Sequence, residues 1–226
     1  MNSEDLVGVH ILKSKLYLNR PIYVGFSILD ISKTLMYDFH YNYIKRKFGS
    51  SARLLFTDTD SLAYTIQTDD FYKHMLEDSD LFDTSEYTKD SPLYNTKNKK
   101  VLGKMKDETY GNAIHAFVGL KSKMYAYTYD VTGEKDGKEV TAHVESKKAK
   151  GIKKYVIEKH TRFEQYKECL LQKKVIMSNM NQIRSYKHQL YNISQTKMGL
   201  SPFDDKRYLL DDGITSYAYG HWKIES

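Results

Sequence analysis

Residues 52–66 read ARLLFTDTDSLAYTI, and this stretch decides the fold of the region around it. The run from Ala52 to Phe56 is short and apolar, and the run from Ser61 to Ile66 alternates between apolar and polar residues, so each is typical of a β-strand. The four residues 57–60, Thr-Asp-Thr-Asp, are of types that favour turns. The stretch therefore predicts a β-hairpin with two aspartates at its turn.

The two aspartates suggest a metal site. Asp58 and Asp60 are two residues apart, so on an extended backbone their side chains leave on one face. Mg²⁺ takes oxygen ligands and is often held by one or two carboxylates plus substrate phosphates. Two such ions can activate an attacking hydroxyl and stabilise a leaving pyrophosphate. Taken alone, Asp-x-Asp is also a common polar turn, and it occurs in metal-dependent glycosyltransferases.

The surrounding sequence predicts an α+β fold. A capping-box pattern at 27–30 and apolar residues at every fourth position predict an amphipathic helix over about 28–47, ended by Gly49. Asp136-Gly137 predicts a hairpin turn between strands near 124–131 and 140–144. A second capping-box pattern at 161–164 predicts a helix to about Gln172, and Asp211-Asp212-Gly213 predicts a further hairpin. Strands are expected to give way to a basic helical region near 149–151, which divides the chain into parts 1–149 and 150–226.

Charge is unevenly distributed along the chain. Its 226 residues carry a net charge of +6, which suits a polyanionic partner. Residues 58–90 contain ten acidic side chains and two lysines, whereas residues 145–187 contain twelve Lys or Arg and four Glu. An acidic site followed by a basic arm fits a metal-dependent enzyme that acts on nucleic acid. A solvated helix face is the alternative for the basic stretch.

Several motifs together resemble family B DNA polymerases. Phe56-Thr-Asp-Thr-Asp-Ser61 resembles their motif C, and the residues from Arg20 to Phe26 and from Ser32 to Tyr37 resemble the preceding palm helix. Lys121-Ser-Lys-Met-Tyr125 resembles their Lys-x-Tyr motif. The segments 149–151, 204–208 and 219–221 also resemble parts of these enzymes. The group that the chain resembles most is the protein-primed polymerases of viruses and of large self-synthesising DNA transposons, over about residues 6–221.

The resemblance implies an incomplete enzyme. Family B polymerases take another metal-binding aspartate from motif A, Asp-x-x-Ser-Leu-Tyr-Pro, and nucleotide-binding Lys and Tyr residues from motif B, and neither pattern is present in this sequence. An upstream 3′–5′ exonuclease domain is also missing. We therefore expect the carboxyl-terminal part of a palm, 1–149, built as an antiparallel hairpin sheet packed on helices, followed by a basic thumb-like region, 150–226. Such a fragment is expected to be inactive alone.

The resemblance also implies roles for particular residues. Asp60 and Asp58 are the expected catalytic and metal-binding residues, with Asp60 as the principal ligand and Asp58 tuning the site and binding metal less directly. The complete enzyme would use two Mg²⁺ ions, a DNA primer–template and deoxynucleoside triphosphates. Lys123 and Tyr125, expected on one strand face, would support the primer terminus, although a cross-strand packing pair is the alternative. The remaining residues expected to follow the DNA backbone are Lys147, Lys148, Lys150, Lys153 and Lys154, each of which could instead be solvated surface.

Other functions remain open at this point. The main alternative is a non-catalytic DNA-binding remnant of a mobile-element or viral polymerase, and a terminal priming protein is a further possible partner of the active form. An unrelated Asp-x-Asp transferase is disfavoured because nothing resembles a sugar-nucleotide Rossmann domain. Asp204, Asp205 and Arg207 are expected to form a structural turn. The single cysteine, Cys169, and the lack of a secretory signal or long apolar run suit an intracellular, nuclear or viral protein that does not enter membranes.

Overall fold

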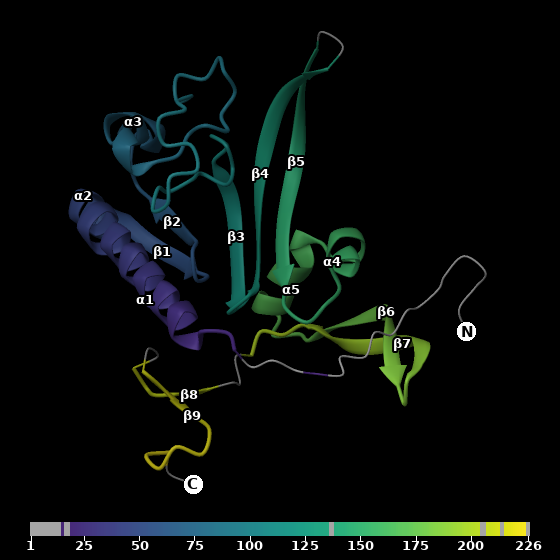
Figure 1. Cartoon of the computed structure of the whole chain (residues 1–226). Coiled ribbons are helices and arrows are strands. Elements are labelled where there is room, and N and C mark those ends of the chain that lie inside the picture. Colours follow the sequence, from purple (N-terminus) through teal and green to yellow (C-terminus); the bar gives the residue numbers. More distant parts are fainter. Residues whose placement is uncertain (1–14, 16–18, 136–137, 204–206, 213–214, 225–226) are drawn as a thin grey trace. The chain divides into compact units, whose positions relative to one another are not determined.

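The computed structural model describes residues 15, 19–135, 138–203, 207–212 and 215–224 (Figure 1). Within them the protein is a mixed α+β structure with small antiparallel sheets, which confirms the predicted fold class. The helices are α1 (Ile22–Asp38), α2 (Arg46–Phe48), α3 (Phe71–Glu77), α4 (Lys154–His160) and α5 (Phe163–Leu171). A π-helix, η1 (Phe39–Lys45), joins α1 to α2, and short 3₁₀ turns cover Gly49–Ser51 and Ser79–Leu81.

The strands in the described part of the chain form four separate sheets. The pairs are β1 (Ala52–Thr57) with β2 (Leu62–Ile66), β6 (Ile176–Tyr186) with β7 (Gln189–Leu200), and β8 (Arg207–Leu209) with β9 (Ser216–Ala218). The three-stranded sheet has the order β3-β4-β5, with β3 (Ile114–Lys121), β4 (Met124–Lys135) and β5 (Lys138–Ala149). The hairpin turn expected at Asp136-Gly137 lies outside the described residues, although the strands on either side of it pair.

The chain divides into two compact units, and strands β3, β4 and β5 contribute residues to both. The amino-terminal unit comprises the described residues of 12–115 and 129–143, and the carboxyl-terminal unit those of 116–128 and 144–224. None of the described helices is long and apolar enough to cross a membrane. Ala149 and Leu200 belong to one buried cluster, so residues on both sides of the expected 149/150 boundary share a core.

The long helix begins earlier than the sequence predicted. Helix α1 starts at Ile22 directly after Pro21, and Ser27, the expected cap, instead donates its hydroxyl to the Tyr23 carbonyl at 2.9 Å. Proline lacks a backbone N–H and its φ suits a helix start, so it outweighed the capping-box pattern. The expected end is confirmed, because the helical segment stops at Phe48 and Gly49 takes a positive φ of 54°.

The core of the amino-terminal unit lies under this helical segment. Met75, Phe82, Tyr87 and Leu93 are buried there, and Phe39 and Tyr43 of the π-helix pack against them. A π-helix widens the helical turn and re-aims the side chains within it. Ile44 of the π-helix is 1% exposed, whereas Ile31 of α1, one of the apolar residues expected on the buried face, is 69% exposed.

The carboxyl-terminal unit has more β-structure than expected. Its core gathers Val118, Ala126, Phe163, Tyr166 and Cys169, so the single cysteine is a buried core residue. Helix α5 begins at Phe163 with Arg162 as its cap, one residue later than predicted, and Gln165 accepts the Arg162 N–H at 2.8 Å. Residues 176–200 form the long β6–β7 hairpin, so the expectation of a mainly helical region after 151 is wrong.

Candidate functional site

The predicted carboxylate hairpin is present in the structure. Strands β1 and β2 pair from Ala52 opposite Ile66 to Thr57 opposite Leu62, and the loop of residues 58–61 joins them. Asp58 is half-buried, while Asp60 is exposed at the tip. The hairpin therefore holds both carboxylates at the end of two strands, with Asp60 open to solvent.

Backbone hydrogen bonds fix the turn. The Asp58 N–H donates to the Ser61 carbonyl at 3.0 Å, and the N–H groups of Asp60 and Ser61 donate to the Asp58 carbonyl at 2.7 and 3.3 Å. Thr59 takes a positive φ of 63°, a conformation that L-residues adopt at a cost. Asp58 and Asp60 thus stand on either side of a left-handed residue rather than on a straight strand, so the alternation of an extended backbone does not set their directions.

The helical segment supports the hairpin through an aromatic contact. The rings of His40 and Tyr64 stack with centroids 5.8 Å apart and an interplanar angle of 11°. His40 Nδ1 also lies 2.9 Å from the Tyr64 hydroxyl, and burial raises the pKa of that hydroxyl to about 12. Lys45 adds a hydrogen bond of 3.1 Å from Nζ to the Ala52 carbonyl. These contacts fix the base of the hairpin, at the end away from Asp58.

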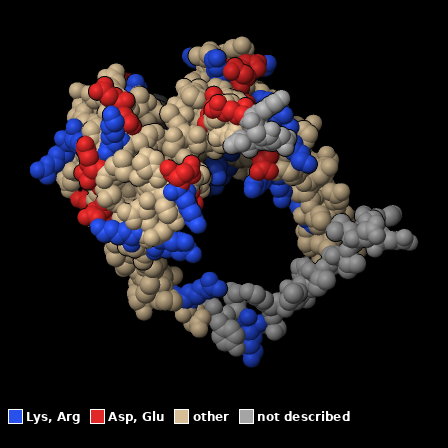
Figure 2. Space-filling view, turned by 90° about the horizontal axis from the view of Figure 1, so that it is seen from above, with Lys and Arg blue, Asp and Glu red and all other residues tan. Residues whose placement is uncertain are grey.

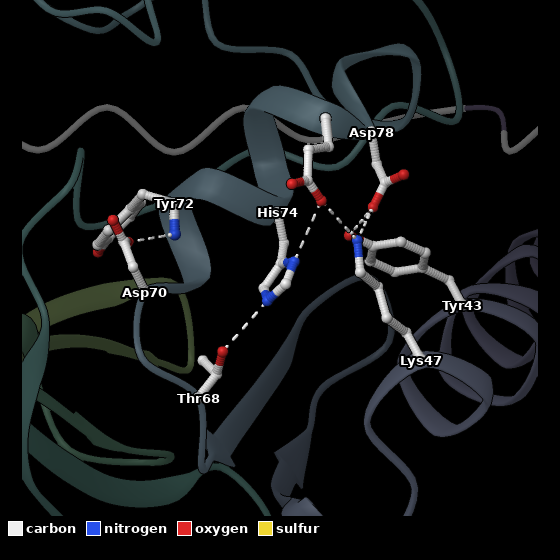
Figure 3. Close-up of polar contacts among 8 residues, drawn as sticks. Tyr43, Lys47, Thr68, Asp70, Tyr72, His74 and Asp78 are labelled. Carbon is white, nitrogen blue, oxygen red and sulfur yellow. Dashed lines mark hydrogen bonds and ion pairs between the residues drawn. The ribbon is translucent and has the colours of Figure 1, made fainter.

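Most acidic side chains of residues 58–90 stabilise local structure. Figure 3 shows Lys47 reaching the carboxylate of Asp78, with an Nζ–Oδ2 distance of 2.5 Å, while the Tyr43 hydroxyl donates to the same oxygen at 2.9 Å. Burial opposes the ionisation of Asp78, but the hydrogen bonds from Lys47 and Tyr43 outweigh it and lower its pKa. In the same view Asp70 caps α3 by accepting the Tyr72 N–H at 2.9 Å.

The loop after α3 uses its acids in the same way. Asp80 accepts from Lys97 Nζ at 2.6 Å, Asp83 accepts the Ser85 and Lys100 N–H groups at 3.0 Å, and Glu86 pairs with Lys106. Among the described residues, no three His, Cys, Asp or Glu side chains form a group that could hold a metal ion. Asp58 and Asp60 carry oxygen atoms of the type that Mg²⁺ takes as ligands.

Lys123 and Tyr125 do not share a strand face. Lys123 lies in the turn between β3 and β4 with a φ of 58°, and its side chain is exposed. Tyr125 lies on β4, is 8% exposed and faces the rings of Phe117 and Tyr127 at centroid distances of 6.3 and 6.5 Å. The expectation of one shared face is wrong because the strand begins at Met124, one residue after the lysine.

Lys147 differs from the other lysines expected to bind DNA. Its side chain is 7% exposed, and its Nζ donates to Glu145 at 2.9 Å and to the Thr161 carbonyl at 2.8 Å. Burial opposes the ionisation of Glu145, but the hydrogen bond from Lys147 and the contacts around it lower its pKa. The charge of Lys147 is compensated inside the fold, so we leave this residue out of the basic surface described next.

The remaining lysines lie on the surface of the carboxyl-terminal unit. Lys148, Lys150, Lys153 and Lys154 are exposed around the turn at Gly151. The Lys150 N–H donates to the Lys123 carbonyl at 3.0 Å, which brings the β3–β4 turn to the same place. Figure 2 shows Lys and Arg side chains beside Asp and Glu side chains in several places. Lys154 Nζ lies 3.5 Å from the Glu158 carboxylate. We call the five residues Lys123, Lys148, Lys150, Lys153 and Lys154 the lysine surface.

The structure also brings together a group that the sequence analysis did not identify. Asp130 accepts from His143 Nδ1 at 2.7 Å and lies 3.3 Å from His115 Nε2, so one carboxylate bridges histidines from two neighbouring strands. The turn that the sequence predicts at Asp136-Gly137 would place residue 143 opposite residue 130, and a turn at 122–123 would place residue 115 opposite it. The register was therefore available from the turn positions. All three side chains are substantially exposed, which suits a structural contact.

Of the structural turn expected at Asp204, Asp205 and Arg207, the structure describes only Arg207. Asp204 and Asp205 lie outside the described residues, but Arg207 donates through Nε to the Ser216 hydroxyl at 2.7 Å. Asp212 accepts the Thr215 N–H at 2.7 Å, and strands β8 and β9, on either side of the predicted turn, pair with each other. These contacts give Arg207 a structural role.

Comparison with protein-family models, curated proteins and solved structures gives no match. The resemblance to family B polymerases thus rests on the sequence motifs alone.

Proposed function

We propose that this chain is the later palm and the thumb of a family B DNA polymerase, which performs template-directed nucleotidyl transfer together with segments beyond its 226 residues. The observation that carries the proposal is the β1–β2 hairpin, which matches motif C in sequence and holds an exposed Asp60 and a half-buried Asp58 at its turn. In this proposal Asp60 is the principal metal ligand, and Asp58 adjusts the charge of the site.

The donor set explains why the proposed site is incomplete. Two Mg²⁺ ions, when bound, would activate the primer hydroxyl and stabilise the leaving pyrophosphate. Asp58 and Asp60 contribute two neighbouring negative charges, and these repel each other unless a cation lies between them. The aspartate of motif A and the cations of motif B, which would neutralise a triphosphate, are missing from the sequence. We therefore expect weak metal binding and no primer extension by this chain alone.

The lysine surface would hold the DNA in this proposal. Lysines contact phosphates as point charges and carry no sequence information, so they suit a primer–template of any sequence. The resemblance to protein-primed enzymes makes a terminal priming protein a further proposed partner of the complete enzyme.

A reconstitution experiment tests the proposal. An upstream polymerase segment that carries motifs A and B would be joined to the chain, and primer extension would be measured with Mg²⁺ and all four deoxynucleoside triphosphates. We expect activity only in the joined protein and its loss in Asp60→Asn. The matched control is Asp69→Asn, which removes the same charge from an exposed aspartate beyond the other end of β2. Extension by the isolated chain that disappears in Asp60→Asn would overturn the claim of an incomplete site.

A second candidate is non-catalytic DNA binding. The observation that favours it is the gathering of the lysine surface around Gly151, joined by the Lys150–Lys123 backbone hydrogen bond. Each phosphate contact should steepen the dependence of log affinity on log salt by roughly 0.9, so five lysines predict a slope of about −4.5. Replacing Lys150, Lys153 and Lys154 with Gln should flatten this slope, whereas Lys99→Gln in the amino-terminal unit should not. Sequence-independent binding without any rescue of synthesis would favour this second function.

A further inference from the structure

A ladder of aromatic rings lies at the carboxyl-terminal end of the described chain. The rings of Tyr217 and His221 stack with centroids 4.4 Å apart and an interplanar angle of 6°. The ring of Trp222 follows that of His221 at 5.9 Å and 23°. Tyr217 and His221 are half-buried, whereas Trp222 is 82% exposed. The ladder therefore ends in a large flat ring that is open to solvent.

The backbone holds this ladder in place. Tyr217 lies on β9, whose pairing with β8 is fixed by the two hydrogen bonds from Arg207 to the side chain and carbonyl of Ser216. Gly220 takes a positive φ of 84°, which turns the chain so that the His221 N–H reaches the Ala218 carbonyl at 3.0 Å. The glycine turn thus brings the imidazole back over the Tyr217 ring.

One hydrogen bond orients the imidazole itself, and a second fixes the backbone of the same residue. His221 Nδ1 accepts the Lys223 N–H at 3.2 Å, and the His221 carbonyl accepts the Ile224 N–H at 2.9 Å. The His221 imidazole stacks with both the Tyr217 and the Trp222 rings. The ladder therefore loses little conformational freedom when a further ring stacks on it, and such preorganisation favours binding.

We propose that the stacking platform formed by Tyr217, His221 and Trp222 binds unpaired nucleobases of single-stranded DNA on the exposed Trp222 ring. Every nucleobase has a flat π-face, so aromatic side chains bind single strands by stacking with little dependence on sequence. The choice of DNA as the ligand rests on the proposed function; the stacking itself does not depend on a complete polymerase site.

The local charge supports stacking rather than phosphate binding. The described residues 207–224 of the hairpin contain Arg207 and Lys223 as cations and Asp211 and Asp212 as anions, which gives no net charge. Arg207 is engaged with Ser216, and Lys223 Nζ lies 5.2 Å from the centroid of the Trp222 ring. A lysine side chain is flexible, so Lys223 can move from the ring to the phosphate beside a bound base. Binding here should accordingly depend less on salt than binding at the lysine surface.

The sequence provides a direct probe, because Trp222 is its only tryptophan. The full chain would be titrated with a short oligo(dT) while tryptophan fluorescence is recorded. The same oligonucleotide with abasic sites supplies the phosphates without the bases, and a blunt duplex supplies stacked bases. We expect oligo(dT) to quench the fluorescence and the other two ligands to leave it nearly unchanged.

Affinity measurements on variants complete the test, with the anisotropy of a labelled oligo(dT) as the readout. Trp222→Ala should weaken binding roughly five- to hundred-fold, the range expected for loss of one base–aromatic stack. Trp222→Phe should retain most of the affinity because it keeps an aromatic face. The control is Tyr186→Ala, which removes a 64% exposed ring from the β6–β7 hairpin and should change affinity less than two-fold.

Several results would overturn the proposal. Equal quenching by oligo(dT) and the abasic strand would show that phosphates, not bases, are bound. Unchanged affinity in Trp222→Ala would remove the platform from the DNA contact, and concentration-dependent quenching without DNA would assign the exposed ring to a protein interface. Failure of the joined enzyme to extend a primer would leave these fluorescence results unaffected, so the two proposals can fail separately.

Discussion

The contact of Asp78 with Lys47 and Tyr43 offers a measurable test of how the amino-terminal unit is held together. Asp78 accepts two hydrogen bonds, from Lys47 Nζ at 2.5 Å and from the Tyr43 hydroxyl at 2.9 Å. Its side chain is 33% exposed and that of Lys47 is 27% exposed. Hydrogen bonds to charged groups contribute roughly 1.5–3 kcal/mol, and exposed ion pairs about 0.2–1 kcal/mol. Because both side chains are partly exposed, we expect each hydrogen bond of this contact to contribute a free energy between these two ranges.

Substitution of Asp78 should therefore lower the free energy of unfolding in a graded way. Asp78→Ala removes both hydrogen bonds and should cost about 2 kcal/mol, whereas Asp78→Asn keeps an oxygen for the Tyr43 hydroxyl and should cost about 1 kcal/mol. Guanidinium unfolding followed by far-ultraviolet circular dichroism measures the change. Tryptophan fluorescence would not report it, because Trp222 belongs to the carboxyl-terminal unit.

The pH dependence gives a second readout of the same contact. The pKa of Asp78 is lower in the folded protein than its ordinary value of 3.8. A depressed folded-state pKa contributes stability that is present above about pH 4 and is lost as pH falls through the folded value. The difference between the wild type and Asp78→Asn should accordingly shrink on acidification. Asp80→Asn, in a more exposed pair with Lys97, should lower the midpoint less than Asp78→Asn does. Equal midpoints for Asp78→Ala and the wild type would refute the reasoning.

Three further substitutions have defined outcomes in the same unfolding assay. Ile44→Ala should lower the free energy of unfolding by about 2–5 kcal/mol, because Ile44 is 1% exposed. Ile31→Ala, at a 69% exposed position, should change it by no more than about 0.5 kcal/mol. Tyr166→Phe should lower the free energy of unfolding by about 1 kcal/mol, because the buried hydroxyl donates to a β5 carbonyl at 3.0 Å. Tyr191→Phe, at an exposed position, should lower it less, and an equal loss in both variants would contradict this account. Thr59→Gly should raise stability by up to about 1 kcal/mol by relieving the positive φ, and a clear loss would contradict this account of the turn.

Local sequence determined the elements whose causes lie within a few residues. The β1–β2 hairpin, the end of the helical segment at Gly49 and the β8–β9 hairpin were all predictable because turn residues act through their own backbone preferences. Where two local signals competed, the sequence reasoning chose the weaker one, as when the capping-box pattern at Ser27 was preferred to the helix start after Pro21. The long β6–β7 hairpin was not predicted, because the basic residues that precede it favour a helical region after 151 and residues 176–200 carry few turn signals.

Tertiary structure decided how the charged side chains are used, because a charge shows its partner only after the chain has folded. The sequence places Lys147 among equivalent lysines, yet its ammonium is buried against Glu145 and the Thr161 carbonyl, fourteen positions away. The sequence likewise gives Asp78 the same character as Asp60, but Asp78 bonds to side chains more than thirty positions earlier, while Asp60 remains exposed at a turn. The sequence alone determined that a carboxylate hairpin forms; long-range packing decided which carboxylates stayed available for chemistry, because a desolvated charge must find a partner in the fold.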